Sequence, residues 1–555
     1  MIDIAASPAP GTDIRASHRA GAGPARKAAV TAAEAATSVI AALLLTALAW
    51  RLRVDPVERI GQVSGLAAIQ LRLLFLLAAT VLLYAFFARM WPGAAVRLAS
   101  AAVAGLATGV IAAGNVVALS GTDWPMYANW ADAGNLQQWA FNIIDGVALP
   151  KEYPPGFPHL LASTAQLFFD GDVPKAMKWL MIGFAAIAGP AAYLAWRLLL
   201  PPLWALGVGV TSTLPLMDLY KPYSALVLIV VIPVFAKLVD VVQRSAELGR
   251  KRATAAGAGL GVLLAAMFLL YSGWFLWSAV GVVVLFALVL VRLARAGGKR
   301  ALADGLLALG ASAAAFLLLA GSYLVNLLAT GGSTKDGYFY FDTFSDPAYF
   351  AMWGGAFPGR QRVAGWPPLG ELGGVQLFSV VLVIGLGVAL TLGLRRPAVL
   401  TLAACTGSAF LLRYWYASHM ERDGAVQLYP RTSLQITYCL IALTGLAVYL
   451  TVQRVRAWSR AHGGAATAGE PRRTAGAAGT PRAMVIGALC ASGLLFGMAG
   501  SATANAYMPA SPGENSNGQL TWTAHNVRLP NGECPKFAEH GKCAPYNPPQ
   551  RVGKH

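Results

Sequence analysis

Long apolar runs that recur along the whole chain limit its fold more than any other feature. About thirteen stretches of roughly 20 residues carry few or no charges at their centres, and each is long enough to cross ~30 Å of hydrocarbon as a helix at ~1.5 Å rise per residue. The predicted spans are 30–50, 66–88, 98–119, 176–199, 202–218, 222–240, 254–273, 274–294, 302–328, 375–394, 398–416, 432–453 and 484–504. The shortest of these, 202–218, begins with two prolines.

The composition agrees with these runs. Of the 555 residues, 56% are hydrophobic and only 12% are charged, which is far from the average soluble domain. The sequence therefore predicts an all-α polytopic membrane protein with about thirteen transmembrane helices, whose external loops carry interfacial helices.

The positions of Lys and Arg predict the orientation, because cytoplasmic loops carry an excess of both. With a cytoplasmic N-terminus, most basic loops fall inside, and the exceptions are Arg51, Arg53 and Arg59. Four segments then share the external compartment: 120–175, 329–374, 417–431 and 505–555. The formal net charge of +18 is thus explained by topology and anionic headgroups rather than by nucleic-acid binding.

The remaining parts of the chain divide by composition. Residues 1–29 are expected to form a disordered cytoplasmic N-terminus, 454–483 a basic cytoplasmic linker before the last span at 484–504, and 505–555 a short external tail. The membrane domain proper is 30–453.

The five cysteines divide into two groups. Cys405, Cys439 and Cys490 lie in apolar spans, whereas Cys534 and Cys543 face each other across a short loop of the tail. A disulfide between the latter two fits an oxidising external compartment. The alternative is a zinc site with His525 and His540, although the usual paired ligand spacings are missing.

The acidic loop, 120–175, is the part of the sequence that most invites a chemical explanation. Acidic residues are scarce in the flanking spans, yet Asp123, Asp132, Asp145 and Glu152 gather here. We expect Asp123 to cap a helix that opens at Trp124 and Pro125 and that places Asp132, Asn135, Trp139 and Asn142 on one face along the membrane surface. Residues 156–169 are too short to cross and are predicted to form a re-entrant or interfacial helix.

Sugar transfer to a hydroxyl would use such a loop. A carboxylate takes the proton of the acceptor hydroxyl, and a cation stabilises the departing phosphate. The basic candidates near the same face are Lys151, His159, Lys221, Arg360, Arg362, Arg422 and Arg431. Each acid could instead be a solvated charge or a helix cap. A carboxylate pair could hold Mg²⁺ or Mn²⁺, or act as base and orienting group with no ion.

Two other segments can be interpreted in two ways. Loop 329–374 is dense in aromatic residues and is either a sugar platform or an interfacial belt with a folded lid. The charged turn that runs from His419 to Asp423 and on to Arg431 could contact a donor phosphate, or position charges at a helix mouth.

Short motifs in these loops resemble a known family. Gly121-Thr122-Asp123, Glu152-Tyr153-Pro154-Pro155-Gly156 and Gly365-Trp366-Pro367-Pro368-Leu369-Gly370-Glu371-Leu372-Gly373-Gly374 are similar to motifs of the galactan 5-O-arabinofuranosyltransferases within the GT-C superfamily of integral-membrane glycosyltransferases. That family's external C-terminal domain is larger than the tail found here.

The resemblance implies a function and a site. It implies transfer of arabinofuranose from a polyprenyl phosphate to a cell-wall galactan, within 30–453, with Asp123 as general base and Asp132 orienting substrate or holding a cation. The expected substrate-binding residues are Asp145, Lys151, Glu152, Tyr153, His159, Arg360, Arg362, Trp366, Arg422 and Arg431. A lipid donor needs no nucleotide loop, and the sequence has no G-x-x-x-x-G-K-[ST] motif.

Three alternatives stay open at this point. One is a GT-C enzyme for another polyprenyl-linked sugar such as mannose. The second is a secondary transporter or lipid flippase, although such proteins place ionisable groups near the bilayer midplane and often show repeated halves. The third is a noncatalytic scaffold of wall assembly, whose acidic loop would tolerate substitution.

Overall fold

The computed structural model describes residues 24–330, 377–424, 431–462, 482–511 and 517–546. Over these ranges the chain is helical and has no β-strand. A single isolated bridge pairs Val527 with Ala544. The prediction of an all-α architecture is therefore confirmed for the described part of the chain.

Ten helices within the described ranges are long and apolar enough to cross a membrane. They are α1 (Pro24–Trp50), α2 (Arg59–Phe87), α3 (Pro92–Ala118), α6 (Val173–Arg197), α8 (Pro222–Gln243), α10 (Arg250–Leu270), α11 (Gly273–Thr330), α14 (Pro397–Ser418), α16 (Thr432–His462) and α17 (Arg482–Ala506). The chain is a multi-pass membrane protein by this measure.

Three further features modify this simple pattern. Helix α11 is 58 residues long and is interrupted at Gly298, whose φ of 65° and ψ of −162° lie outside the helical region. Helix α7 (Pro202–Thr213) continues into the short 3-10 helix η1 (Leu214–Leu216), and α13 (Leu377–Gly393) has 17 residues. Both are apolar but shorter than a full span.

Helix α3 lies at the centre of one half of the bundle. Small residues on α3 let its neighbours approach closely: a Cβ added to Gly105 would lie 2.0 Å from the Ser38 carbonyl oxygen, and one added to Gly189 of α6 would lie 2.2 Å from the Ala104 carbonyl oxygen. Close backbone approach of this kind is how helices associate in lipid, where no hydrophobic effect drives them together.

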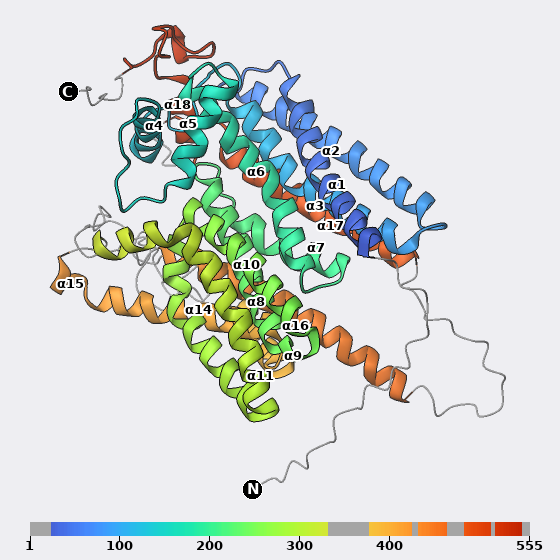
Figure 1. Ribbon diagram of the computed structural model, residues 1–555. Helices are drawn as coiled ribbons and strands as arrows, with labels where there is room; N and C mark the ends of the chain where they lie inside the picture. Colours follow the sequence, from blue (N-terminus) through green and yellow to red (C-terminus); the bar gives the residue numbers. More distant parts are fainter. Residues whose placement is uncertain (1–23, 331–376, 425–430, 463–481, 512–516, 547–555) are drawn as a thin grey trace, which may run out of the picture.

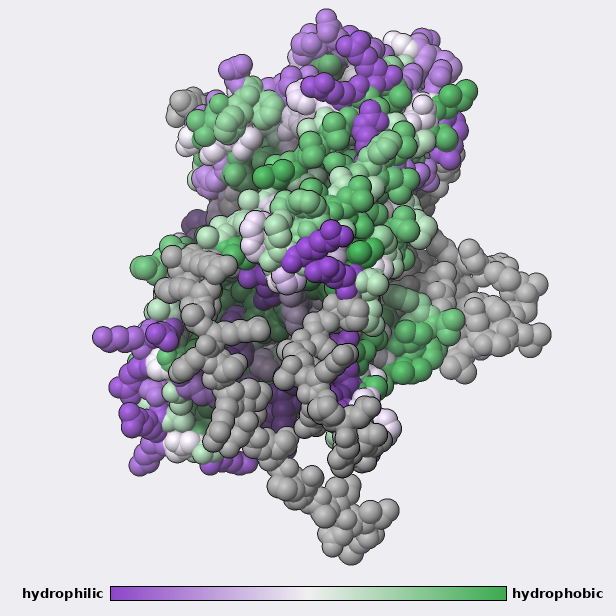
Figure 2. All heavy atoms as spheres, turned by 90° about the vertical axis from the view of Figure 1, so that its right-hand side faces the viewer, coloured by the Kyte–Doolittle hydropathy of each residue, from purple (hydrophilic) through white to green (hydrophobic). Residues whose placement is uncertain are grey.

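The helix ends gather at two opposite faces of the bundle. One face, called here the loop face, carries the acidic loop with α4 (Ala131–Ile144) and α5 (Gly156–Phe168), the turn 217–221, α15 (Met420–Asp423), and the tail with α18 (Gly518–His525) and η5 (Glu539–Gly541) (Figure 1). The opposite face carries the ends of α6 and α8 and the short helix α9 (Ser245–Leu248). Figure 2 shows a mostly hydrophilic top, where the tail and acidic loop lie, above a band of mostly apolar side chains.

The tail folds back onto the root of the acidic loop, which the sequence did not predict. The indole Nε1 of Trp124 donates to the Val527 carbonyl at 3.1 Å, and the Thr122 hydroxyl donates to the Ala524 carbonyl at 2.8 Å. The backbone N–H of Lys536 donates to the Gly121 carbonyl at 2.9 Å. The tail and the loop therefore form one packed unit.

The helix expected to open at Trp124 does not form there. Residues 122–130 are irregular and α4 begins at Ala131, so Asp123 caps no helix. Tyr127 and Ala128 adopt left-handed φ values of 65° and 49°, and the Tyr127 N–H is bound to the Leu520 carbonyl. Contacts with the tail thus override the local helix signal. Asp132, Asn135, Trp139 and Asn142 do lie on α4, as expected.

Cys534 and Cys543 are joined by a disulfide, with their Cα atoms 5.7 Å apart. His525 is fully buried and its Nε2 lies 2.8 Å from the Ala118 carbonyl oxygen. This arrangement does not fit the alternative zinc site, because both sulfurs are bonded to each other and His525 faces a backbone carbonyl.

Candidate functional site

Asp132 pairs with Lys221 where α4 meets the turn before α8. Asp132 lies in the first turn of α4, and its Oδ2 accepts from the Lys221 ammonium. The neighbouring Ala133 N–H donates to the Tyr220 hydroxyl at 2.9 Å. The start of α4 is thus held against Tyr220 and Lys221 by two contacts, while the Asp132 carboxylate is still 50% exposed.

Lys221 and Arg431 line one pocket at the loop face. This two-cation pocket has a volume of about 190 Å³, and its other lining residues are Leu216, Asp218, Tyr220, Ser224, Ala225, Leu228, Tyr271, Trp274 and Leu434. Arg431 donates to the Tyr271 hydroxyl at 3.2 Å. Two basic candidates separated by more than 200 positions in the sequence are therefore brought to one cavity with an apolar wall.

Asp218 organises the rim of this pocket. Its Oδ1 accepts from the Tyr220 N–H at 2.8 Å and from the Tyr507 hydroxyl at 3.3 Å. Burial raises the pKa of Asp218 above its ordinary value. Tyr507 follows the last span, so its hydrogen bond to Asp218 connects the pocket to the tail.

A group of tyrosines separates the two-cation pocket from a second cavity. Tyr153 lies 3.3 Å, oxygen to oxygen, from Tyr223, and burial raises the pKa of Tyr153. The second cavity is about 440 Å³ and is lined by Lys151, Tyr153 and His159 together with residues near the end of α11. The Glu152 carbonyl accepts from the Tyr323 hydroxyl at 3.3 Å. The predicted residues Lys151 to His159 thus sit beside the Lys221 site and outside its pocket.

Asp123 lies in a different and larger cavity of about 600 Å³. Asp170, Asp172 and residues 529–531 of the tail also line it. The Lys175 ammonium is 3.7 Å from Asp123 Oδ2, and the Asp123 side chain is 47% exposed. The structure does not place Asp123 and Asp132 in one pocket among the described residues.

A buried lysine fixes the turn that carries Asp123. Lys178 of α6 is 8% exposed, and its ammonium donates to the Leu119 and Thr122 carbonyls at 2.9 and 2.6 Å. Sequence reasoning missed this residue, although a lysine one turn inside an apolar helix is a signal that it has a partner.

The other predicted residues lie apart from the two-cation pocket. Asp145 is the C-terminal cap of α4, and Arg422 is exposed and pairs with Asp423 at 2.8 Å. Arg360, Arg362 and Trp366 lie outside the described residues. The aromatic segment around them, 331–374, is outside as well.

The described residues do not form a divalent-cation site at Asp132. They contain no cluster of three or more His, Cys, Asp or Glu side chains that could hold an ion. The partner of Asp132 is an ammonium group, which repels a second cation. The pocket carries its positive charge on Lys221 and Arg431.

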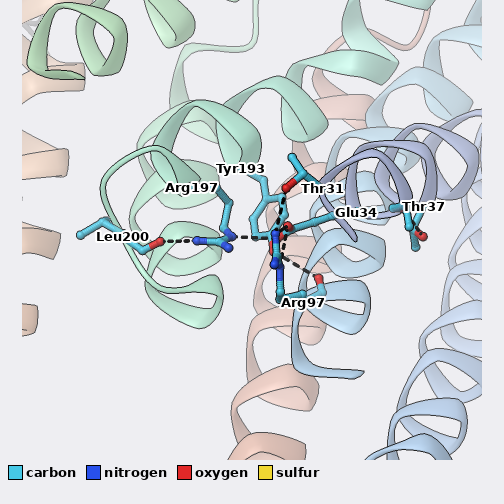
Figure 3. Close-up of polar contacts among 8 residues, drawn as sticks. Thr31, Glu34, Thr37, Arg97, Tyr193, Arg197 and Leu200 are labelled. Carbon is cyan, nitrogen blue, oxygen red and sulfur yellow. Dashed lines mark hydrogen bonds and ion pairs between the residues drawn. The ribbon is translucent and has the colours of Figure 1, made fainter. Parts of the chain in front are cut away.

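A second charged cluster lies at the opposite face and was not predicted. Glu34 of α1 is 1% exposed, and it accepts from Arg97 of α3 and Arg197 of α6 at 2.6 and 2.7 Å (Figure 3). Tyr193 points at the same carboxylate and donates to its Oε1 at 2.5 Å. This cluster ties three helices together and lines none of the pockets described above.

Comparison with known proteins does not assign a family or a function to these residues. No family model matches the chain, and no curated protein matches it.

Proposed function

We propose that this protein is an integral-membrane glycosyltransferase that works at the loop face. Its donor is a sugar, arabinofuranose by the motif resemblance, linked to a polyprenyl phosphate, and its acceptor is a cell-wall galactan. The observation that supports this most is the two-cation pocket: Lys221 and Arg431 line one cavity, and the carboxylate of Asp132 is bound to Lys221 at its rim.

The proposed step uses these groups directly. Asp132 takes the proton of the acceptor hydroxyl, whose oxygen bonds to the anomeric carbon of the sugar while the bond from that carbon to the phosphate oxygen breaks. The electron pair leaves with the polyprenyl phosphate. Lys221 and Arg431 stabilise its negative charge. Cations that are already held in place lower the energy of the transition state as this charge develops.

The apolar wall suits a lipid donor. Leu228 and Trp274 face the cavity from α8 and α11, and Leu434 at the start of α16 is 42% exposed. A phosphate between Lys221 and Arg431 would therefore have apolar side chains beside it for the first isoprene units. A lipid-linked substrate needs a pocket near the level of the headgroups that offers cations to its phosphate and apolar side chains to its lipid.

Asp123 receives a different role in this proposal from the one the motif resemblance implies. It lies with Asp170 and Asp172 in the larger cavity, away from both cations, and its partner is Lys175. We assign it to acceptor positioning. A general base must reach the hydroxyl that attacks the donor, and this hydroxyl lies near the donor phosphate. Asp132 is closer to the proposed phosphate site than Asp123, so we assign the base to Asp132.

The topology proposed here has thirteen crossings and an external loop face. Gly298 divides α11 into two helices, and α7 with η1 and α13 are counted as short crossings in addition to the ten long helices. The basic groups Arg250 to Arg252 and Arg292 to Arg300 then lie on the cytoplasmic side. The disulfide of the tail lies on the oxidising side.

Replacement of the cations tests the proposal. Purified protein in lipid nanodiscs is given a synthetic polyprenyl-phospho-arabinofuranose and a galactan oligosaccharide. Lys221→Gln and Arg431→Gln are each expected to lower kcat by about 100-fold, the typical loss on removing one donor that stabilises a developing oxyanion. Lys299→Gln, at an exposed lysine beside the break in α11 and outside that pocket, is the matched control. Wild-type turnover in both pocket variants contradicts the proposal.

One residue supports the transporter or flippase as a second candidate. Arg72 lies at the middle of α2, and its guanidinium donates to the Ala68 carbonyl of its own helix at 2.9 Å. A charge at this depth is a functional hypothesis by default. If the protein translocates a lipid-linked sugar, Arg72→Gln will abolish translocation in vesicles; if it is a transferase, the same variant will keep its turnover.

A further inference from the structure

The tail and the acidic loop enclose a cleft that none of the proposed steps has used. This tryptophan cleft has a volume of about 500 Å³, and Trp130 of the loop and Trp522 of α18 both line it. Its polar lining residues are Thr523, Asn526, Glu539, His540 and Lys542. Helices α4 and α18 lie close together at this corner of the molecule (Figure 1).

Trp130 is unusual for a residue in a packed loop. It is 49% exposed although it directly precedes α4, and its neighbour Trp124 in the same loop is fully buried. Its side chain caps nothing. An exposed indole face can stack against the C–H groups on one face of a sugar ring. Polar groups beside it can hydrogen-bond to the hydroxyls of the sugar.

The polar groups of the cleft divide into structural and available ones. Asn526 is occupied: its Oδ1 accepts from the Glu539 N–H at 3.0 Å and its Nδ2 donates to the Trp522 carbonyl at 3.0 Å. Glu539 and Lys542 are exposed, and both residues line the cleft. A carboxylate and an ammonium beside an indole can accept from and donate to sugar hydroxyls.

The cleft is built to hold its shape. The disulfide between Cys534 and Cys543 closes the segment that carries Glu539 and Lys542. The Ala544 N–H donates to the Asn526 carbonyl at 2.8 Å, and the Arg528 N–H donates to the Ala544 carbonyl at 2.9 Å. Side chains positioned on such a braced segment lose little freedom when a ligand binds.

Aromatic rings lead from the cleft to the two-cation pocket. The centroids of Trp130 and Tyr127 are 5.6 Å apart, and those of Tyr127 and Tyr220 are 6.2 Å apart. Tyr220 lines the two-cation pocket, and Asp132 is two residues beyond Trp130. A chain that lies on Trp130 would therefore have its end beside the proposed base.

We propose that the tryptophan cleft binds the acceptor polysaccharide, with Trp130 and Trp522 against sugar rings and Glu539 and Lys542 on hydroxyls. This inference rests on the proposed transferase function, which is what makes the bound polysaccharide an acceptor. It adds the place where that acceptor binds. The tail is then an acceptor-recognition element that folds onto the membrane domain.

Binding without a donor tests the cleft separately from the reaction. The full-length protein in nanodiscs is titrated calorimetrically with a galactan-derived hexasaccharide. Trp130→Ala is expected to weaken binding about tenfold, the loss typical of truncating a central aromatic anchor, and Trp130→Phe to recover part of it. Glu539→Gln, which keeps the size of the side chain, should also weaken binding. Trp458→Ala is the control, since Trp458 is 63% exposed on α16 far from the cleft.

The results separate the two proposals. If the wild type does not bind the hexasaccharide, or if Trp130→Ala binds it as tightly as the wild type, the cleft is not the acceptor site. If the wild type binds with the expected loss in Trp130→Ala but transfers no sugar, the cleft stands and the transferase proposal falls. If both hold, Trp130→Ala raises the KM for acceptor about tenfold and leaves the KM for donor unchanged.

Discussion

The two charged clusters of the molecule differ in how completely their carboxylates are occupied. Glu34 at the opposite face is 1% exposed and has three side-chain donors, from Arg97, Arg197 and Tyr193. Asp132 at the loop face is 50% exposed, and the interaction described for its side chain is the one with Lys221. An ionised carboxylate offers about four lone-pair positions, so Glu34 is nearly saturated and Asp132 is not.

This difference separates a structural role from a chemical one. A saturated, buried carboxylate holds α1, α3 and α6 together but has little capacity left to bind a hydroxyl or take a proton. A half-exposed carboxylate beside a pocket contributes little to stability and can do both. In the sequence Glu34 is a lone acid inside an apolar run and Asp132 lies in the acidic loop, but neither position gives the number of donors that each carboxylate receives.

The largest expected effect is on the stability of the Glu34 cluster. Glu34→Gln leaves Arg97 and Arg197 facing a neutral group, and breaking a buried ion pair from one side costs about 3–5 kcal/mol. The midpoint of thermal unfolding in detergent should fall clearly. Glu58→Gln, at an exposed glutamate on the loop face, is the control and should leave that midpoint unchanged. If Glu34→Gln unfolds like the wild type but loses transfer activity, the two clusters do not differ as described.

The second prediction concerns the pH dependence of tail docking. Burial lowers the pKa of His525 to about 4, from an ordinary value near 6.5. The unfolded tail therefore takes up the proton first, and the stabilisation from the neutral ring, about 3 kcal/mol, is complete above pH ~6.5 and lost as the pH falls toward ~4. The protection factors of the tail amides, which are corrected for the intrinsic pH dependence of amide exchange, should fall over that window, while those of the α3 amides stay high.

The control for this prediction is His525→Gln, whose amide can still donate to the Ala118 carbonyl. In this variant the protection factors of the tail amides should vary much less between pH 6.5 and pH 4. The same fall in protection factors in the wild type and in His525→Gln would show that another group controls the docking.

The third prediction concerns the disulfide of the tail. Its loop is short, so removing it with Cys534→Ser and Cys543→Ser is expected to cost the tail about 2–3 kcal/mol. Limited proteolysis should then cut between 531 and 546, and the hexasaccharide should bind more weakly. The unfolding midpoint of the membrane domain should not change. A cleavage pattern like that of the wild type would mean that packing alone holds the tail in place.

The smallest expected effect is at Lys175. Its ammonium lies 3.7 Å from Asp123, and both side chains are more than 40% exposed. Exposed pairs of this kind contribute at most about 1 kcal/mol, so Lys175→Gln should barely change the unfolding midpoint. The measurement sharpens the comparison, because a drop as large as that of Glu34→Gln would place Asp123 among the structural carboxylates.

Most of the membrane architecture was predictable from the sequence because hydropathy is a local property. Most of the predicted runs coincide with long helices, 202–218 and 375–394 coincide with shorter apolar ones, and the boundary between 274–294 and 302–328 falls at the break around Gly298. The helix opening at Trp124 was predicted wrongly, because the Trp124 indole and the Tyr127 N–H bind the tail some 400 residues later. Local propensity carries no information about such a partner.

The candidate site was predictable in its parts and unpredictable in its grouping. Asp132, Lys221 and Arg431 were each expected at the same face, but their meeting around one pocket depends on how α4, α8 and α16 pack. The resemblance implied that Asp123 is the general base, but Asp123 lies in another cavity. Glu34 was visible in the sequence as a lone acid inside an apolar run, a signal that it has buried partners.

Transfer by the two aspartate variants tests the central claim most directly. Wild type, Asp132→Asn and Asp123→Asn are compared at equal thermal stability with polyprenyl-phospho-arabinofuranose and a galactan oligosaccharide, with Asp145→Asn as control. The proposal predicts that Asp132→Asn loses at least about 100-fold in kcat, as expected for a general base, while Asp123→Asn mainly raises the KM for acceptor. Unchanged turnover in Asp132→Asn, or no transfer by folded wild type, would contradict it.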